Sequence, residues 1–230
     1  MSAPVRRPRT RLPRAERERE ILSAARAVFS ERGYAAGSVA EVAARAGVAE
    51  GTVFSYFETK QALLLRVIAD FYAALIDDVE SGLRAVRGTE NRLRFLVARH
   101  LQVFVQDLGI CRIVLSELRP DPALYGDSVI ELNRSYTSLA LDVIKEGIGS
   151  GELRSDVSPT VLRDLIFGGV EHVLWRFVNT GAELPVESLG EQLSDVLLTG
   201  ALPHARTADP TVERLERAVA TLERRAGAQR

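Results

Sequence analysis

A group of cationic side chains opens the sequence. Five arginines precede Ala15 in the stretch MSAPVRRPRTRLPR, and Pro4, Pro8 and Pro13 lie among them. Proline at this density prevents a helix and favours an extended arm over residues 1–13. Guanidinium groups on such an arm are attracted to the negative potential of the DNA minor groove. A tail that only keeps the protein soluble explains the same residues, and the sequence leaves both interpretations open.

The sequence contains no pattern typical of metal binding or covalent catalysis. Three histidines and a single cysteine, Cys111, are too few and too widely spaced for a zinc site. No Gly-x-Ser-x-Gly elbow, phosphate-binding glycine loop or metal-spaced His/Glu pair occurs. We therefore expect no catalytic residue, no metal and no cofactor. One cysteine and the absence of any apolar run near roughly 18 residues favour a cytoplasmic protein that does not enter a membrane.

Charge is distributed unevenly along the chain. Residues 1–60 contain 11 Lys/Arg and 7 Asp/Glu, whereas the remainder contains 19 and 24. A basic N-terminal part on an acidic body is typical of a nucleic-acid-binding protein with a separate regulatory domain. Ordinary unevenness of surface charge is the alternative. With 46% hydrophobic residues, the chain can bury a substantial core.

Helical signals follow the arm, and turn residues divide them. Apolar residues recur at helical spacing over residues 21–29, before a glycine. Ser38 and Glu41 match a capping box that starts a second helix, which Gly47 ends. The next helix holds about seven residues, 50–56. Such a pair of short helices around a glycine is typical of a helix-turn-helix, whose second helix lies in the DNA major groove.

Beyond residue 60 the pattern predicts helices and no strands. Apolar residues at helical spacing favour helices over residues 60–88, 93–105, 110–118, 122–147, 159–180 and 186–199. No strand-period alternation of useful length, internal repeat or βαβ signal occurs, so we predict an all-α fold. After a linker-like stretch, TVERLERAVATLERR predicts a short accessory helix within residues 204–230.

The predicted helix 159–180 is apolar around most of its circumference. Ser158 and Pro159 form a strong start signal, because a capping residue precedes proline at the first helical position. A surface helix needs one apolar stripe. A helix with two must bury one face in its own core and the other against something else. The sequence therefore predicts a partner surface on this helix.

The segment SVAEVAARAGVAEGTVFSYFETKQALL resembles the DNA-binding signature of the TetR family of transcription regulators. The resemblance covers roughly residues 15–66, and the rest of the chain resembles the family in helix layout and length. It implies an N-terminal three-helix helix-turn-helix domain over residues 14–60. It also implies a C-terminal helical bundle for ligand binding and dimerisation over residues 61–203.

The resemblance and the basic arm together imply a set of DNA-binding residues: Arg9, Arg11, Ser38, Gly51, Thr52, Val53, Phe54, Tyr56 and Lys60. The family's roles place Val53 and Phe54 toward the groove and Ser38, Tyr56 and Lys60 on phosphate. For Tyr56, a role as a core aromatic is equally open.

Two positions depart from the family's pattern. Ala49 stands where a capping serine is common, which costs the recognition helix about 1 kcal/mol. Phe54 stands where tyrosine is common, so a hydroxyl donor is missing while contact with a thymine methyl remains available.

The family pairs its last two core helices with those of a second subunit, which would supply the missing partner of helix 159–180. The interface residues implied here are Leu165, Ile166, Gly169, Val173, Leu189, Leu193, Val196 and Leu197. A two-fold homodimer would present two reading heads to a palindromic operator.

Family members commonly bind a small molecule inside the helical domain, which changes the separation of the heads and releases DNA. Aromatic or polar residues in mid-helix are possible lining residues, with core packing as the alternative for each: Phe104, Cys111, Leu115, Tyr136, Phe167, Glu171, His172 and Trp175. The stretch IFGGVEHVLWRFV loosely resembles members that respond to acyl-CoA or other lipophilic compounds.

We predict a ligand-responsive repressor. An activator or dual regulator is the alternative, and a helical enzyme or scaffold is a remote one.

Overall fold

A computed structural model describes residues 13–180 and 184–203, and every regular element in these two ranges is a helix. The prediction of an all-α fold is confirmed. The arginine arm with Arg9 and Arg11 and the predicted accessory helix over residues 204–230 lie outside the described residues.

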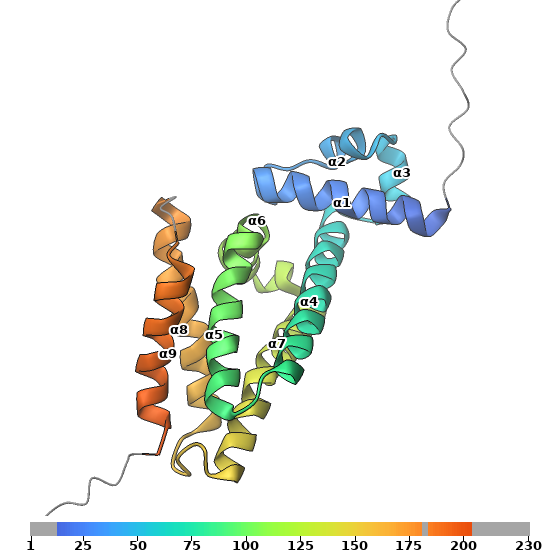
Figure 1. The fold of residues 1–230 in the computed structure, drawn as a ribbon. Helices are drawn as coiled ribbons and strands as arrows, with labels where there is room; N and C mark the ends of the chain where they lie inside the picture. Colours follow the sequence, from blue (N-terminus) through green and yellow to red (C-terminus); the bar gives the residue numbers. More distant parts are fainter. Residues whose placement is uncertain (1–12, 181–183, 204–230) are drawn as a thin grey trace, which may run out of the picture.

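Three helices form the head of the molecule, at the top of Figure 1: α1 (Arg14–Arg32), α2 (Val39–Ala46) and α3 (Glu50–Phe54). α1 packs against α2, and α2 packs against α3. The core of the head consists of buried apolar side chains from all three helices, among them Ile21, Ala25, Phe29, Val42, Ala43 and Val53. This burial holds α3, which is too short to be stable alone.

Local capping signals set the ends of the head helices. The Ser38 hydroxyl accepts a hydrogen bond from the Glu41 amide (3.2 Å), and the Glu41 carboxylate accepts one from the Ser38 amide (2.9 Å). This confirms the predicted capping box at the start of α2. Gly47 ends α2 with φ 64°, a left-handed conformation that suits glycine. Ala49 provides no side-chain cap for α3, which spans five residues rather than the seven expected.

The body contains five long helices: α4 (Lys60–Ala85), α5 (Thr89–Gln106), α7 (Pro122–Ser150), α8 (Pro159–Thr180) and α9 (Val186–Ala201). α4 runs from the head along the body, and α8 and α9 lie on the side away from it (Figure 1). α4 packs on α7, α5 on α9, and α7 on α8. The short helix α6 (Leu108–Ile113) and the π-helical segment η1 (Val114–Leu118) lie where the body meets the head.

Two predicted helices are less regular than the sequence pattern indicates. The Arg119 amide donates to the Val114 carbonyl five residues earlier (3.0 Å), so the second half of the predicted helix 110–118 is a π-turn. The predicted helix 122–147 contains a kink at Gly126, whose φ of 66° and ψ of 150° are not helical. A residue with a Cβ would rarely adopt that conformation.

The two N-caps of the head offer a matched test of local stability. We expect Ser38→Ala to lower the free energy of unfolding by about 1 kcal/mol, because the first turn of α2 loses its side-chain acceptor. Ala49→Ser should raise it, since the backbone at Ala49 (φ −77°, ψ 149°) already has the extended conformation of an N-cap. Urea denaturation followed by circular dichroism measures both. Shifts of the same sign in the two variants would contradict capping as the cause.

Candidate functional site

The outward face of α3 is open to an external surface. Glu50 and Gly51 are exposed, and the Phe54 side chain is 44% exposed although it is apolar. A Cβ built on Gly51 meets no atom within 4 Å. No described part of the chain therefore requires glycine at this position, and another molecule can approach the backbone closely here.

Val53 was predicted to face the groove, and this prediction is wrong. Its side chain is 1% exposed and belongs to the core of the head. Since a helix turns by about 100° per residue, Glu50, Gly51 and Phe54 share one face of α3 and Val53 lies on another. Val53 positions the recognition helix from beneath. Thr52 is half-buried at the edge of the outward face.

Ser38 and Tyr56 are both engaged within the head. The Ser38 hydroxyl lies 2.9 Å from the Glu41 carboxylate, and the hydrogen bond from the Ser38 amide lowers the pKa of Glu41. Tyr56 is half-buried, and the guanidinium of Arg14 lies 5.0 Å from the centroid of its ring. These contacts orient both side chains, and their contact with phosphate remains a prediction.

Lys60 begins α4 and lies next to the turn between α1 and α2. Its ammonium lies 4.4 Å from the centroid of the Tyr34 ring and donates to the Ala35 carbonyl (3.3 Å). A cation over an aromatic ring is favourable and fixes the direction of a long side chain. Lys60 is thereby held on the head, with donors left for a further contact.

A partly open cavity of about 420 Å³ lies in the body. Its walls come from α4, α5, α6, η1, α7 and α8. Six of the eight predicted ligand residues line it: Phe104, Cys111, Leu115, Tyr136, Phe167 and Glu171. The volume lies in the range of about 300–1,000 Å³ that is typical of small-molecule sites.

The other two predicted ligand residues do not line the cavity. His172 is exposed on the outer face of α8, one heptad after Leu165. Trp175 is 47% exposed and lies one helical turn beyond Glu171, the last lining residue of α8. The sequence did not show which face of α8 meets the cavity, because this helix is apolar on two faces, and both residues lie on the other face.

An aromatic group surrounds His100, a lining residue that was not predicted. The centroid of its ring lies 4.9 Å from that of Phe167, 5.5 Å from that of Phe104 and 5.7 Å from that of Tyr136. Burial, with a smaller effect of the Arg119 charge, lowers the pKa of His100 to about 3, so the imidazole is neutral. His100 lies four residues after Leu96 and so continues the apolar stripe of α5. This spacing could have identified it from the sequence as a buried residue.

Three arginines that were not predicted also line the cavity. Arg119 forms a two-bond ion pair with Glu171 of α8, one bond of which is 2.9 Å long. Arg163 pairs with its neighbour Asp164 (2.7 Å). Arg134 forms no ion pair with any carboxylate in the described part of the chain. Because these arginines come from different segments, no local motif marks them.

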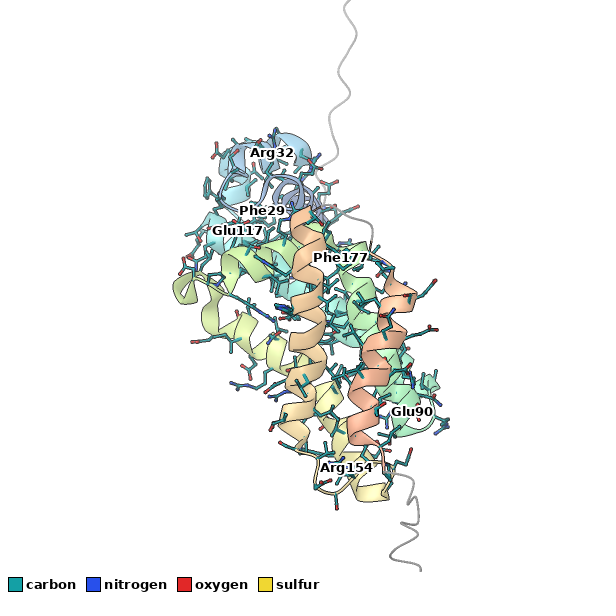
Figure 2. All side chains as sticks on the ribbon, turned by 90° about the vertical axis from the view of Figure 1, so that its left-hand side faces the viewer. Phe29, Arg32, Glu90, Glu117, Arg154 and Phe177 are labelled. Carbon is teal, nitrogen blue, oxygen red and sulfur yellow. The ribbon has the colours of Figure 1, made fainter. Side chains whose placement is uncertain are left out.

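The segment α6–η1 touches both the cavity and the head. Glu117 of η1 accepts hydrogen bonds from the amides of Tyr34 (3.1 Å) and Ala35 (3.0 Å), and it lies beside the head in Figure 2. A Cβ built on Gly109 of α6 would lie 2.5 Å from the Cβ of Ser30 on α1. The crossing of α6 and α1 therefore requires glycine, because a side chain at this position would collide with α1.

The outer faces of α8 and α9 lie side by side, toward the viewer in Figure 2. On α8, exposed residues at spacings of four and three form a continuous stripe: Val161, Leu165, Gly168, His172 and Trp175. On α9, Val196 is 76% exposed. Alternation of four and three is the spacing of helices that pair along a seam.

The predicted interface residues divide into three groups. Leu165 and Val196 are exposed, and five others are partly buried: Gly169, Val173, Leu189, Leu193 and Leu197. Ile166 is 1% exposed and belongs to the core of its own subunit, so its assignment to the interface is wrong. Adjacent residues on a helix point about 100° apart, which separates Ile166 from Leu165.

The described residues contain no group of three His, Cys, Asp or Glu side chains that could hold a metal ion. None of the described helices is long and apolar enough to span a membrane.

Comparison with known families covers both parts of the chain. Residues 21–67 match the family described as "Bacterial regulatory proteins, tetR family", and residues 70–200 match "YsiA-like protein, C-terminal region".

Two bacterial regulators and one solved structure are similar over much of their length. The HTH-type transcriptional repressor KstR2 of Mycolicibacterium smegmatis is 27% identical over 197 residues, covering 81% of this chain and 91% of that protein. The HTH-type transcriptional activator FasR of the same species is 38% identical over 139 residues, covering 60% and 64%. FadR of Bacillus subtilis, crystallised with stearoyl-CoA, superimposes with a TM-score of 0.73 at 24% identity, covering 79% of this chain and 98% of that one.

The matched families cover the helices of the head and of the body, and they confirm the resemblance drawn from the sequence. The chain belongs to the tetR family of bacterial regulatory proteins, and it is a DNA-binding transcription regulator.

Proposed function

We propose that this protein is a repressor that binds a palindromic operator as a homodimer in the cytoplasm and releases it when an acyl-CoA enters the cavity. One observation carries the proposal. The aromatic cavity, with arginines in its wall, shares the segment α6–η1 with the contact to the DNA-binding head. An activator is the second possibility, which the 38% identity to FasR favours.

The DNA-binding part is residues 14–60, with the outward face of α3 in the major groove. Gly51 allows close backbone approach, Thr52 and Phe54 meet the base edges, and Ser38, Tyr56 and Lys60 contact phosphate. The arm with Arg9 and Arg11 adds minor-groove contacts. Phosphate contacts position the head, while the apolar ring of Phe54 suits a thymine methyl.

The ligand-binding and dimerisation part is residues 61–203. The exposed stripe of α8 and Val196 of α9 pack on the same helices of a second subunit, which buries apolar side chains that are otherwise in water. Gly168 and Gly169 have no neighbour within 4 Å of a built Cβ, which leaves room for close approach of a second helix.

The cavity wall has an apolar aromatic part and a part that contains arginines, and an acyl-CoA suits both. The acyl chain is apolar and suits the side chains around Phe104 and Phe167, while the phosphates of the CoA part suit guanidinium groups. Arg134 is the arginine best placed for a phosphate, because the described residues give it no carboxylate partner. The stearoyl-CoA bound to FadR of B. subtilis supports this class of effector.

The signal from the cavity passes through η1. Val114, Leu115 and Arg119 line the cavity, while Glu117 of the same turn binds the amides that follow α1. A ligand that displaces the wall residues therefore moves the carboxylate that holds the head. The resulting change in the separation of the two heads no longer matches the half-sites of the operator.

Release of operator DNA by palmitoyl-CoA tests the effector class. With DNA from upstream of the gene, we expect fluorescence anisotropy to fall as palmitoyl-CoA is added. Arg134→Gln should raise the half-effective concentration about tenfold, because the variant cannot form a charge-assisted hydrogen bond to phosphate. Arg84→Gln, on the far part of α4, is the matched control. No release at any concentration of acyl-CoA would exclude this effector. Transcription that rises when protein binds would make it an activator.

Glu117→Gln tests the connection between cavity and head. The variant removes the charge that binds two amides and leaves the cavity wall intact. We expect palmitoyl-CoA binding, measured by calorimetry, to change less than about twofold. We compare the DNA affinity of the ligand-free protein with that of the ligand-bound protein. The ratio of the two should fall about tenfold in the variant, a change of the size expected for the coupling between two sites. Glu131→Gln, exposed on α7, controls for loss of a negative charge. An unchanged ratio in Glu117→Gln would show that η1 does not carry the signal.

Deletion of residues 1–12 tests the arm. Without its four arginines, the protein should bind all DNA sequences more weakly to the same degree. The slope of log affinity against log salt should fall by about 0.9 for each phosphate that the arm neutralises in the full-length protein. Titration at several salt concentrations measures both quantities. If affinity and slope stay the same, the arm is a solubilising tail.

A further inference from the structure

His100 of α5 carries a buried ring nitrogen that has no hydrogen-bond partner. Its side chain lines the cavity and is 6% exposed, and its Nε2 atom is one of two buried side-chain polar atoms without a partner among the described residues. A buried polar atom left unpaired destabilises the folded protein, because it has lost its hydration without gaining a hydrogen bond. An apolar side chain would suit this aromatic wall better, unless the nitrogen binds something that enters the cavity.

The hydrogen bond on the other side of the ring indicates which proton the imidazole carries. Nδ1 of His100 lies 3.0 Å from the Tyr136 hydroxyl. If the hydroxyl donates, Nδ1 is the acceptor and the proton of the neutral ring sits on Nε2, so one polar group remains unpaired. If Nδ1 donates instead, both the hydroxyl proton and the Nε2 lone pair remain unpaired. The first arrangement is favoured because it leaves fewer polar groups unpaired, and it makes Nε2–H a donor without an acceptor among the described residues.

The surroundings of His100 select an uncharged acceptor. The rings of Phe104 and Phe167 stand edge-on to the imidazole. The nearby guanidinium of Arg119 already pairs with Glu171. Beside His100, a carboxylate or phosphate would lose its hydration without gaining a free counter-charge, because Arg119 is the charge that acts on this ring and it is already paired. A carbonyl oxygen loses little and gains the N–H, and the carbon chain that carries it suits the aromatic walls.

We propose that His100 is a specificity-determining residue whose Nε2–H binds a carbonyl oxygen carried by the apolar part of the effector, with Tyr136 positioning the ring. This inference rests on the proposed function where it concerns acyl-CoA. In that ligand, the carbonyl oxygen is either that of the thioester or that of a keto group along the acyl chain. Both offer the same acceptor to the same donor, and paired ligands distinguish them.

Three ligand pairs, each differing by one oxygen function, test the inference on the full-length protein. Palmitoyl-CoA against its S-hexadecyl thioether tests the thioester carbonyl, and 3-oxopalmitoyl-CoA against palmitoyl-CoA tests a chain carbonyl. The CoA-free pair 2-tridecanone and tridecane tests the donor without the CoA part. We expect the carbonyl member of the CoA-free pair and of at least one CoA pair to bind about tenfold more tightly. Calorimetry or ligand-induced shifts of the melting temperature measure the preference.

Variants distinguish the contribution of the hydrogen bond to the ligand preference from that of side-chain packing. His100→Phe should reduce the preference to within about twofold, whereas His100→Gln, whose amide can donate, should retain part of it. Tyr136→Phe should weaken the preference by a smaller factor, because the proton is no longer held on Nε2. Phe104→Leu is the matched packing control: it should change the affinity for both members of each pair equally. In the wild-type protein, the ¹⁵N NMR signals of His100 should show the Nε2–H tautomer and should shift when 2-tridecanone binds. This measurement does not depend on the folding of any variant.

The outcomes distinguish this inference from the proposed effector. A preference that survives in His100→Phe, or a wild type without preference in any pair, overturns the role of His100 even if palmitoyl-CoA releases DNA. A ketone preference that His100→Phe abolishes, in a protein that binds no acyl-CoA, supports the carbonyl site and excludes acyl-CoA as the effector. An Nδ1–H tautomer in the wild type also overturns the inference, since Nε2 could not then donate.

Discussion

The close crossing of α6 and α1 is the contact on which the connection between the two parts of the molecule depends. A side chain at Gly109 would collide with Ser30 on α1, and Arg26 of α1 pairs with Asp107 at the start of α6. Further along the same segment, Glu117 binds the amides that follow α1. The same stretch of chain forms a wall of the cavity. This short segment therefore has contacts on both sides, with the cavity and with the head.

Much of the head could be predicted because its signals are local. Ser38 and Glu41 are three residues apart, and Gly47 needs only its own backbone conformation, so a few adjacent letters specify a cap and a turn. The face presented by α3 was harder, since a helix of five residues is oriented by what packs beneath it. Val53 was therefore assigned to the wrong side, while Gly51 and Phe54 were correctly placed on the outside.

The site inside the body depends on contacts between distant segments, which a single sequence does not reveal. Arg119 and Glu171 are 52 residues apart, and nothing near either one indicates the other. The kink at Gly126 and the π-turn follow from packing that helical spacing alone cannot show. His100 is different. Its place in the apolar stripe of α5 could have indicated burial, and the missing partner of its buried Nε2 atom calls for an explanation.

The π-turn at Val114–Leu118 sets the helical register between the cavity wall and the contact with the head. A π-turn holds one residue more than an α-turn, so its conversion to α-helix would rotate the residues on one side by about 100° relative to those on the other. Glu117 and the cavity-lining Val114 lie within this turn. Such a change proceeds by a whole residue and has no stable halfway point. A regulator built on it would respond to its ligand in a step and not in proportion to a gradual deformation.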